Sequence, residues 1–142
     1  MTLNNTTPES VKAPLLADYQ RNQQAEKQLR DNPSQTVLLL LQGAVDKGNL
    51  AKVCHKSGSM VEKGFHLGRM TTILDALRDR LMFSAQTPIA NDLERLYNYA
   101  DQCIQEAVTE NDISFLNNAI DVMTEIRDAW LEMLSEADQA SA

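Results

Sequence analysis

Glycine, proline and aromatic residues are scarce in this chain, and their scarcity excludes several folds. The 142 residues include five glycines and four prolines, and aromatic side chains make up only 5%. A β-sandwich or β-barrel needs many turn residues and many β-branched or aromatic strand residues. Hydrophobic residues still amount to 43%, enough for a globular core. The composition therefore predicts a single all-α domain.

Positive charge is scarce in the second part of the sequence. Residues 86–142 contain 2 basic and 12 acidic side chains, whereas residues 1–85 contain 11 basic and 8 acidic ones. A protein that binds nucleic acid needs a basic face that displaces counterions from phosphate. Neither part offers such a face, so we expect no nucleic-acid partner. The acidity is typical of solvated helix surfaces.

Long hydrophobic runs are also missing. The longest run of large apolar residues is Val37–Leu41, whereas a membrane-spanning helix needs about twenty apolar residues. The first residues, MTLNNTTPESVKAP, lack the apolar centre of a secretion signal. The two cysteines, Cys54 and Cys103, lack the spacing of zinc ligands. We therefore expect a cytoplasmic protein without membrane insertion and with two reduced thiols.

Few residues carry catalytic or metal-binding chemistry. The two histidines, His55 and His66, fall on different predicted helices, and they do not combine with the cysteines in a metal-ligand pattern. His66 with Arg69 three residues later matches a histidine phosphotransfer bundle only loosely. No phosphate loop or nucleophile motif is present. We expect no enzymatic activity, no cofactor and no metal, and phosphotransfer is the least favoured alternative.

Four long amphipathic stretches follow a polar N-terminal segment, and local signals mark their ends. A capping residue precedes proline at Asn32-Pro33 and at Thr87-Pro88, which is typical of helix starts. Gly58 is placed to end the first stretch and Asp112 to cap the last. Short connections make successive helices antiparallel, which predicts an up-down four-helix bundle with an N-terminal arm. The predicted parts are a disordered N-terminus (1–14), a docking arm with possible helix (15–32), the bundle (33–136) and a frayed tail (137–142).

The run Val37–Leu41 is more apolar than a bundle helix requires. Five successive residues cover the whole circumference of a helix, so some of these side chains point away from the bundle axis. They are either covered by another segment or exposed as a sticky surface. Methionines in the second stretch add adaptable apolar surface, which suits a protein partner. The N-terminal arm could cover these side chains or a partner could bind them, and the two interpretations are compatible.

Several short motifs occur in a defined order along the chain. They are Tyr19-Gln20-Arg21-Asn22-Gln23, Pro33, the leucine-rich run ending in Gly43-Ala44-Val45, Ile89-Ala90 followed by Leu93, Leu96, Tyr97 and Tyr99, Glu110-Asn111-Asp112, and Ile126-Arg127-Asp128-Ala129-Trp130. In this order the chain resembles the flagellin export chaperone family (FliS-like) over about residues 17–134. It departs from the family pattern at Leu41-Gln42, at Thr87-Pro88 and at Asp92, as a paralogue that serves a particular flagellin would.

The resemblance implies a cytoplasmic export chaperone without a nucleotide site. Such a protein binds the disordered C-terminal segment of flagellin, prevents its premature polymerisation and delivers it to the flagellar export apparatus. It is similar to a receptor that takes a helix into an apolar groove. Flagellar export-gate and regulator proteins are further candidate partners. The alternative from another class is a structural or regulatory bundle that self-associates through the leucine run, and the free chain is expected to be a monomer or a weak dimer.

The surplus apolar positions and the family-like positions define candidate groove residues. They are Leu38, Leu41 and Val45 in the first helix, Met70, Leu74 and Leu77 in the second, and Leu96 and Tyr97 in the third. Leu15, Leu16 and Tyr19 are the candidate movable cover. Because leucines in a heptad-like pattern usually face the bundle interior, a core role stays open for each helix residue. Trp130 is assigned to the core.

Overall fold

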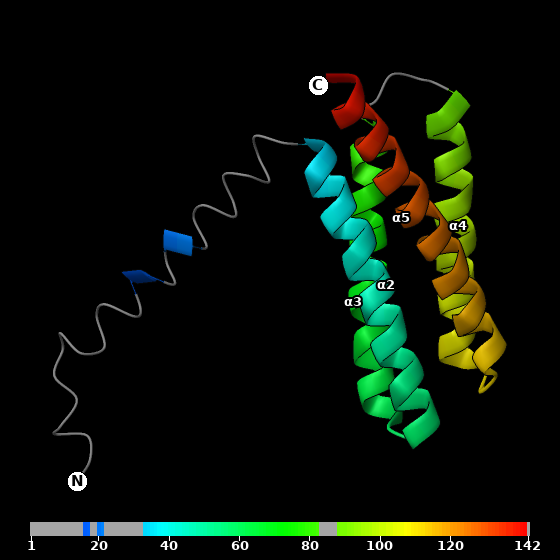
Figure 1. The fold of residues 1–142 in the computed structure, drawn as a ribbon. Coiled ribbons are helices and arrows are strands. Elements are labelled where there is room, and N and C mark those ends of the chain that lie inside the picture. Colours follow the sequence, from blue (N-terminus) through cyan, green and yellow to red (C-terminus); the bar gives the residue numbers. More distant parts are fainter. Residues whose placement is uncertain (1–15, 18–19, 22–32, 83–87, 142) are drawn as a thin grey trace, which may run out of the picture. The chain divides into compact units, whose positions relative to one another are not determined.

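The computed structural model describes residues 16–17, 20–21, 33–82 and 88–141 (Figure 1). The first two short pieces are helical and exposed. The four long helices are α2 (Pro33–Ser57), α3 (Met60–Met82), α4 (Pro88–Thr109) and α5 (Ile113–Ser141). Successive helices run in opposite directions in Figure 1. The predicted all-α fold, an antiparallel four-helix bundle, is thus confirmed.

A glycine shapes the turn between α2 and α3. Gly58 has a φ of 79°, in the left-handed region that favours glycine. The amide of Ser59 donates to the carbonyl of Cys54 at 2.9 Å, and the Gly58 amide donates to the carbonyl of His55 at 3.3 Å. These two bonds form a Schellman motif, which satisfies carbonyls at the end of α2. The chain can then reverse direction within a few residues.

The starts of the helices follow the predicted signals. α2 and α4 begin at Pro33 and Pro88, where the amide that proline lacks would have no partner inside the helix. Before α5, the carboxylate of Asp112 accepts a hydrogen bond from the Ser114 amide at 2.9 Å. This bond lowers the pKa of the Asp112 carboxyl and satisfies one free amide of the first turn.

The end of α5 differs from the expectation. The sequence predicts a bundle that ends at residue 136 and a frayed tail over 137–142, whereas α5 continues to Ser141. The physical reason is local: residues such as Glu136 and Ala137 are good helix formers, and no glycine or proline follows to end the helix. A polar composition removes the apolar stripe without removing helix propensity.

Apolar side chains from all four helices form one core. Its largest fully buried members are Leu41 from α2, Leu67, Met70, Leu74 and Leu77 from α3, Tyr97 and Ile104 from α4, and Leu116 and Met123 from α5. They recur at the spacing of three and four residues that places side chains on one helix face. Trp130, which the sequence analysis assigns to the core, packs against this cluster and is only partly buried.

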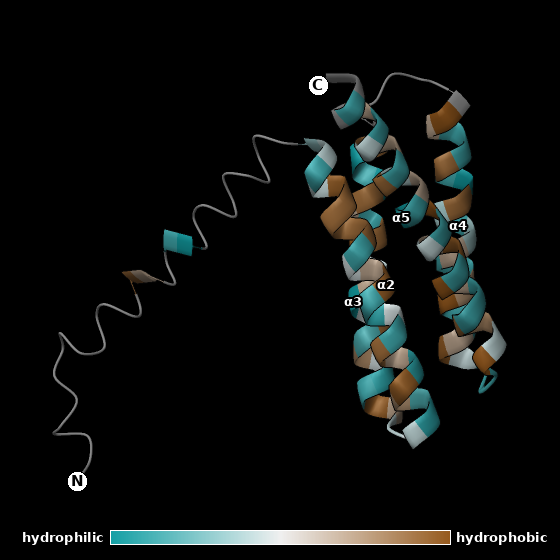
Figure 2. Ribbon diagram, viewed as in Figure 1, coloured by the Kyte–Doolittle hydropathy of each residue, from teal (hydrophilic) through white to brown (hydrophobic). Residues whose placement is uncertain are grey.

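The side chains of the leucine run Val37–Leu41 point to all sides of α2, as five successive apolar residues predict. Leu41 is fully buried, Val37 and Leu40 pack partly against the core, and Leu39 is 51% exposed. The corresponding upper part of α2 is brown over successive residues in Figure 2. Even with this run, no helix among the described residues has both the length and the apolar character to cross a membrane.

Two glycines let α2 approach its neighbours closely. A Cβ atom on Gly48 would lie 2.8 Å from Cγ1 of Ile120 in α5 and 3.3 Å from Cε of Met70 in α3. A Cβ atom on Gly43 would lie 3.3 Å from Cδ1 of Ile73 in α3. Since protein interiors are packed as densely as organic crystals, α2 has no free space at Gly48. Gly48 therefore fixes the fit of α2 between α3 and α5.

Replacing Gly48 with alanine should destabilise the bundle, because the new methyl group cannot fit without a shift of α2 or of Ile120. Overpacking of this kind costs about 1–3 kcal/mol, and alanine offsets about 1 kcal/mol of it through helix propensity. Gly68 in α3 is the matched control, since a Cβ atom there meets nothing within 4 Å. Gly68→Ala should raise the free energy of unfolding by about 0.5–1 kcal/mol. Urea denaturation measures both changes, and an equal gain for the two variants would contradict the close approach at Gly48.

Candidate functional site

An apolar groove lies on the surface between α4 and α5. Its volume is about 290 Å³. Its lining, which we call the α4–α5 groove, consists of Ile89, Leu93 and Leu96 from α4 and of Val122, Glu125, Ile126, Ala129, Trp130 and Met133 from α5. Glu125 is the single charged residue of this lining. The groove thus offers apolar surface at the N-terminal half of α4 and along the middle of α5.

The groove has a buried floor and an exposed rim. Val122 and Ile126 form the floor and are buried, whereas Ile89, Leu96 and Met133 at the rim are 71%, 39% and 46% exposed. Helix geometry explains the alignment, because residues three or four positions apart lie on one side of a helix. Exposed apolar side chains that gather around a hollow mark a binding surface for apolar groups.

Most of the candidate groove residues lie in the core instead. Six of them are buried, namely Leu41, Val45, Met70, Leu74, Leu77 and Tyr97, and the structure brings these six together in one cluster. Leu38 is partly buried, and only Leu96 lines the α4–α5 groove. A partner reaches the six buried residues only if helices separate, so their part in binding stays a prediction.

The candidate cover lies mostly outside the described residues. Leu15 and Tyr19 are not among them, and their role as a cover stays a prediction. Leu16 is described, and its side chain is half exposed on a helical piece.

Apolar periodicity does not identify Ile89, Val122 and Met133 as groove residues, and it assigns Trp130 to the core. For Val122, a usable signal is present in adjacent apolar pairs. In Leu96-Tyr97 and in Val122-Met123, two neighbouring apolar residues widen the apolar arc of their helix beyond one stripe. Tyr97 and Met123 take the central positions, and the other member of each pair lines the groove.

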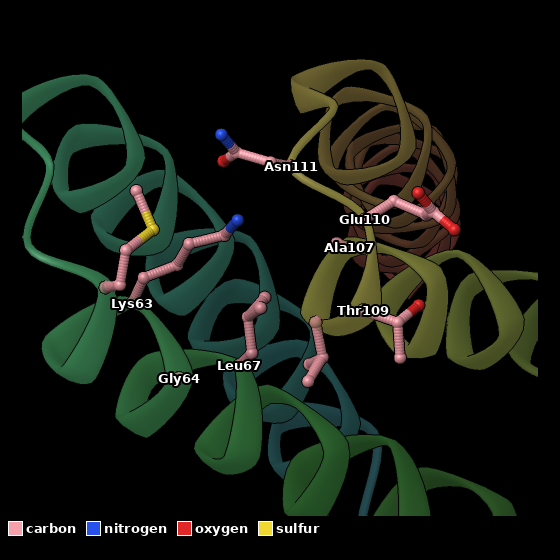
Figure 3. Close-up of a pocket in the computed structure, with 9 residues that line it drawn as sticks. Lys63, Gly64, Leu67, Ala107, Thr109, Glu110 and Asn111 are labelled. Carbon is pink, nitrogen blue, oxygen red and sulfur yellow. The ribbon is translucent and has the colours of Figure 1, made fainter.

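A second pocket lies between α3 and α4, beside the turn that leads to α5 (Figure 3). Its volume is about 340 Å³. Its lining, which we call the α3–α4 pocket, consists of Met60, Lys63, Gly64, Leu67, Ala107, Val108, Thr109, Glu110 and Asn111. The pocket combines apolar walls with the ammonium group of Lys63. It lies at the C-terminal end of α4, whereas the α4–α5 groove lies at the N-terminal half of the same helix.

The histidines and cysteines do not form a metal site in the described part of the chain. Cys54 and Cys103 are free, buried thiols, and the Sγ atom of Cys54 is 3.9 Å from Oε2 of Glu62. The Nδ1 atom of His66 is buried and has no hydrogen-bond partner among the described residues, and its ring packs edge-on against Phe65 at 5.6 Å between centroids. Within the described ranges, no three His, Cys, Asp or Glu side chains gather as a metal site.

Alkaline pH should destabilise the bundle through Tyr97. Burial raises the pKa of Tyr97 from 10.0 to about 12, because a phenolate is poorly solvated in the core. Above pH 10 the unfolded chain loses a proton that the folded chain keeps, so stability falls between about pH 10 and 12, by about 1.4 kcal/mol per pH unit. Below pH 10 Tyr97 contributes no pH dependence. Tyr97→Phe should lose this part of the alkaline decline.

Denaturant midpoints measured across this pH range in the parent chain and in Tyr97→Phe provide the comparison. An identical decline in the parent chain and in Tyr97→Phe would mean that Tyr97 is accessible to solvent rather than buried.

The chain is similar to known proteins over most of its length. The sequence model of a family described as flagellar protein FliS matches residues 15–137. The flagellar secretion chaperone FliSB of Pseudomonas aeruginosa is 31% identical over 106 residues, which cover 74% of this chain and 84% of that protein. The flagellar secretion chaperone FliS of Vibrio cholerae is 29% identical over 111 residues, which cover 78% of this chain and 82% of that protein. The family match includes all residues that line the α4–α5 groove.

Proposed function

This chain belongs to the FliS family of flagellar proteins, and on that premise we propose that it is a cytoplasmic export chaperone for flagellin. It binds the disordered C-terminal segment of flagellin, prevents premature polymerisation and delivers the segment to the flagellar export apparatus. The two relatives are both named flagellar secretion chaperones. The observation that carries the binding mode is the α4–α5 groove, an apolar hollow with an exposed rim.

The groove has the dimensions of a short helix-binding site. Ile89 and Leu96 lie seven residues apart on α4, which corresponds to about 10 Å along the helix axis. A client helix laid against this length presents apolar residues from about two of its turns. The rim residues Ile89, Leu96 and Met133 then lose contact with water. Apolar anchors at three- and four-residue spacing in the client are the matching sequence pattern.

The magnitude of this contact supports reversible binding. Complete burial of one large apolar side chain contributes about 1.5–3 kcal/mol, so three rim residues contribute about 5–9 kcal/mol at most. Association and ordering of a disordered segment cost several kcal/mol in return. The groove alone therefore binds weakly. Firm binding requires that the client also covers other exposed apolar side chains of α4 and α5, such as Tyr99 and Leu131. Release at the export apparatus needs no nucleotide.

Charge around the groove favours some client segments over others. The part of the chain that contains α4 and α5 carries 12 acidic and 2 basic side chains. Glu125 stands in the lining itself. A client segment that adds acidic residues beside its apolar anchors would be repelled, whereas basic residues there would be attracted at low ionic strength. Flagellar export-gate and regulator proteins stay further partner predictions.

The double variant Ile89→Gln/Leu96→Gln should weaken binding of a flagellin C-terminal peptide by about tenfold or more, because each glutamine removes an apolar contact. Both positions are exposed in the free chain, so folding should be preserved. The matched control is Val61→Gln/Phe65→Gln, which replaces two exposed apolar residues on α3 away from the groove. Isothermal titration calorimetry with a panel of flagellin C-terminal peptides measures both, and the control should change the affinity less than twofold.

Two other results would contradict parts of this proposal. Absence of heat with every peptide, together with self-association in light scattering, would contradict the chaperone function and favour the self-associating bundle. Equal weakening by the two double variants would contradict the α4–α5 groove as the client site.

A further inference from the structure

Lys63 is a buried lysine with no acidic partner in the part of the chain that the structure describes. Its side chain lies in the first turns of α3 and is 5% exposed. Its Nζ atom lies 2.9 Å from Nδ1 of His55 in α2, and no carboxylate of the described residues forms an ion pair with it. An ammonium group has three donors, and His55 uses one of them. Because a buried charge is costly unless an anion pairs with it, Lys63 has an unmet need for an acceptor.

The free side of the ammonium group faces the α3–α4 pocket. Figure 3 shows the Lys63 side chain reaching from α3 toward Asn111, whereas the carboxylate of Glu110 is turned away from it. Leu67 and Val108 are apolar residues of the pocket lining. Gly64 adds no side chain, and a Cβ atom there would meet nothing within 4 Å, so the pocket stays open toward solvent.

The neighbouring carboxylates are engaged elsewhere. Glu62 lies on the same turn of α3, and its Oε2 atom is 3.9 Å from the thiol of Cys54. The carboxylate of Asp112 accepts the Ser114 amide at 2.9 Å as the cap of α5. Asp112 forms no ion pair with Lys63 among the described contacts. The described residues therefore leave this ammonium group able to bind an acceptor from a partner.

We propose that the α3–α4 pocket binds an acidic side chain of a partner polypeptide. The carboxylate accepts a charge-assisted hydrogen bond from Nζ of Lys63, and the methylene groups above it pack against Leu67 and Val108. This site is independent of the flagellin proposal, since the α4–α5 groove lies at the opposite end of α4.

The surface around the pocket suits a continuous partner segment that passes across the pocket. It is less suited to a chain terminus that ends in the pocket. Met60 and Val108 at the mouth are exposed, and Phe65 continues the exposed apolar surface along α3. Arg69 lies over the Phe65 ring, with its guanidinium carbon 6.0 Å from the ring centroid, and no described carboxylate pairs with it. A segment that crosses here meets apolar surface on the way and a second cation beyond the pocket, which suits an acidic amphipathic partner.

The test uses N-acetylglutamate N-methylamide as the probe and its glutamine analogue as the neutral control. In nuclear magnetic resonance titrations, the glutamate probe should shift the backbone amides of residues 60–67 and 107–111 with saturation. The glutamine analogue should bind at least about tenfold more weakly. Lys63→Met, which keeps the apolar stem and removes the charge, should lose the difference between the probes. Lys56→Met, which removes a nearby exposed lysine, should preserve it.

Two further readouts make the outcome independent of the variant's folding. Lys63→Met should melt at the same temperature as the parent chain or higher, because it deletes a buried charge. In the parent chain, the ¹⁵Nζ resonance of Lys63 should move with the glutamate probe and stay in place with the glutamine analogue. Equal binding of the two probes, or a Lys63 resonance that does not respond, would overturn the proposal. Tighter binding of N-acetylleucine, whose carboxylate is a chain end, would overturn the assignment to an acidic side chain.

Discussion

The close approach of α2 to α3 and α5 at Gly48 decides which apolar side chains are buried. At this position a single Cβ atom would come within 2.8 Å of Ile120. Because α2 packs so closely against α3 and α5, Leu41 and Met70 are completely buried in the bundle. The interior has no room for a partner side chain unless a helix moves, which would expose the whole core to water. In the proposed function, the client therefore binds apolar side chains that stay exposed on the intact bundle.

Those surplus side chains are arranged by the same helix geometry that builds the core. α4 and α5 each carry an apolar arc wider than one stripe, and its outer edge lines the α4–α5 groove. A chaperone needs such apolar surface without loss of its own fold. The acidic side chains of the same part of the chain keep that surface soluble, since like charges oppose self-association. In the proposed function, the client binds the exposed edge of these arcs, while Val122 and Ile126 at the groove floor also belong to the core.

The fold was largely predictable from the sequence because its signals are local. Pro33, Pro88, Gly58 and Asp112 act within one turn of the helix that they start or end, so their effect can be read without knowledge of the tertiary structure. The end of α5 was not predictable in this way. The end of the apolar pattern marks where core packing ends, but the helix continues as long as its residues favour helix.

The candidate site was predictable only in part, for a geometric reason. Leu96 and Tyr97 are neighbours separated by about 100° around the helix axis. Periodicity identifies both as apolar but does not tell which one faces the centre, because that depends on where α5 packs. The burial of Lys63 is still less accessible from sequence, since it depends on His55 from another helix and on the turn after α4. Both features arise from contacts between segments that lie far apart in the chain.

Hydrogen–deuterium exchange of the whole chain, with and without a flagellin C-terminal peptide, tests most directly whether the client binds outside an intact core. The α4–α5 groove predicts new protection at residues 89–96 and 122–133, while the amides of 41–45 and 70–77 keep their slow exchange. Faster exchange at 41–45 and 70–77 on binding, without new protection at the groove, would show that the client separates the helices and enters the core, and would contradict this account.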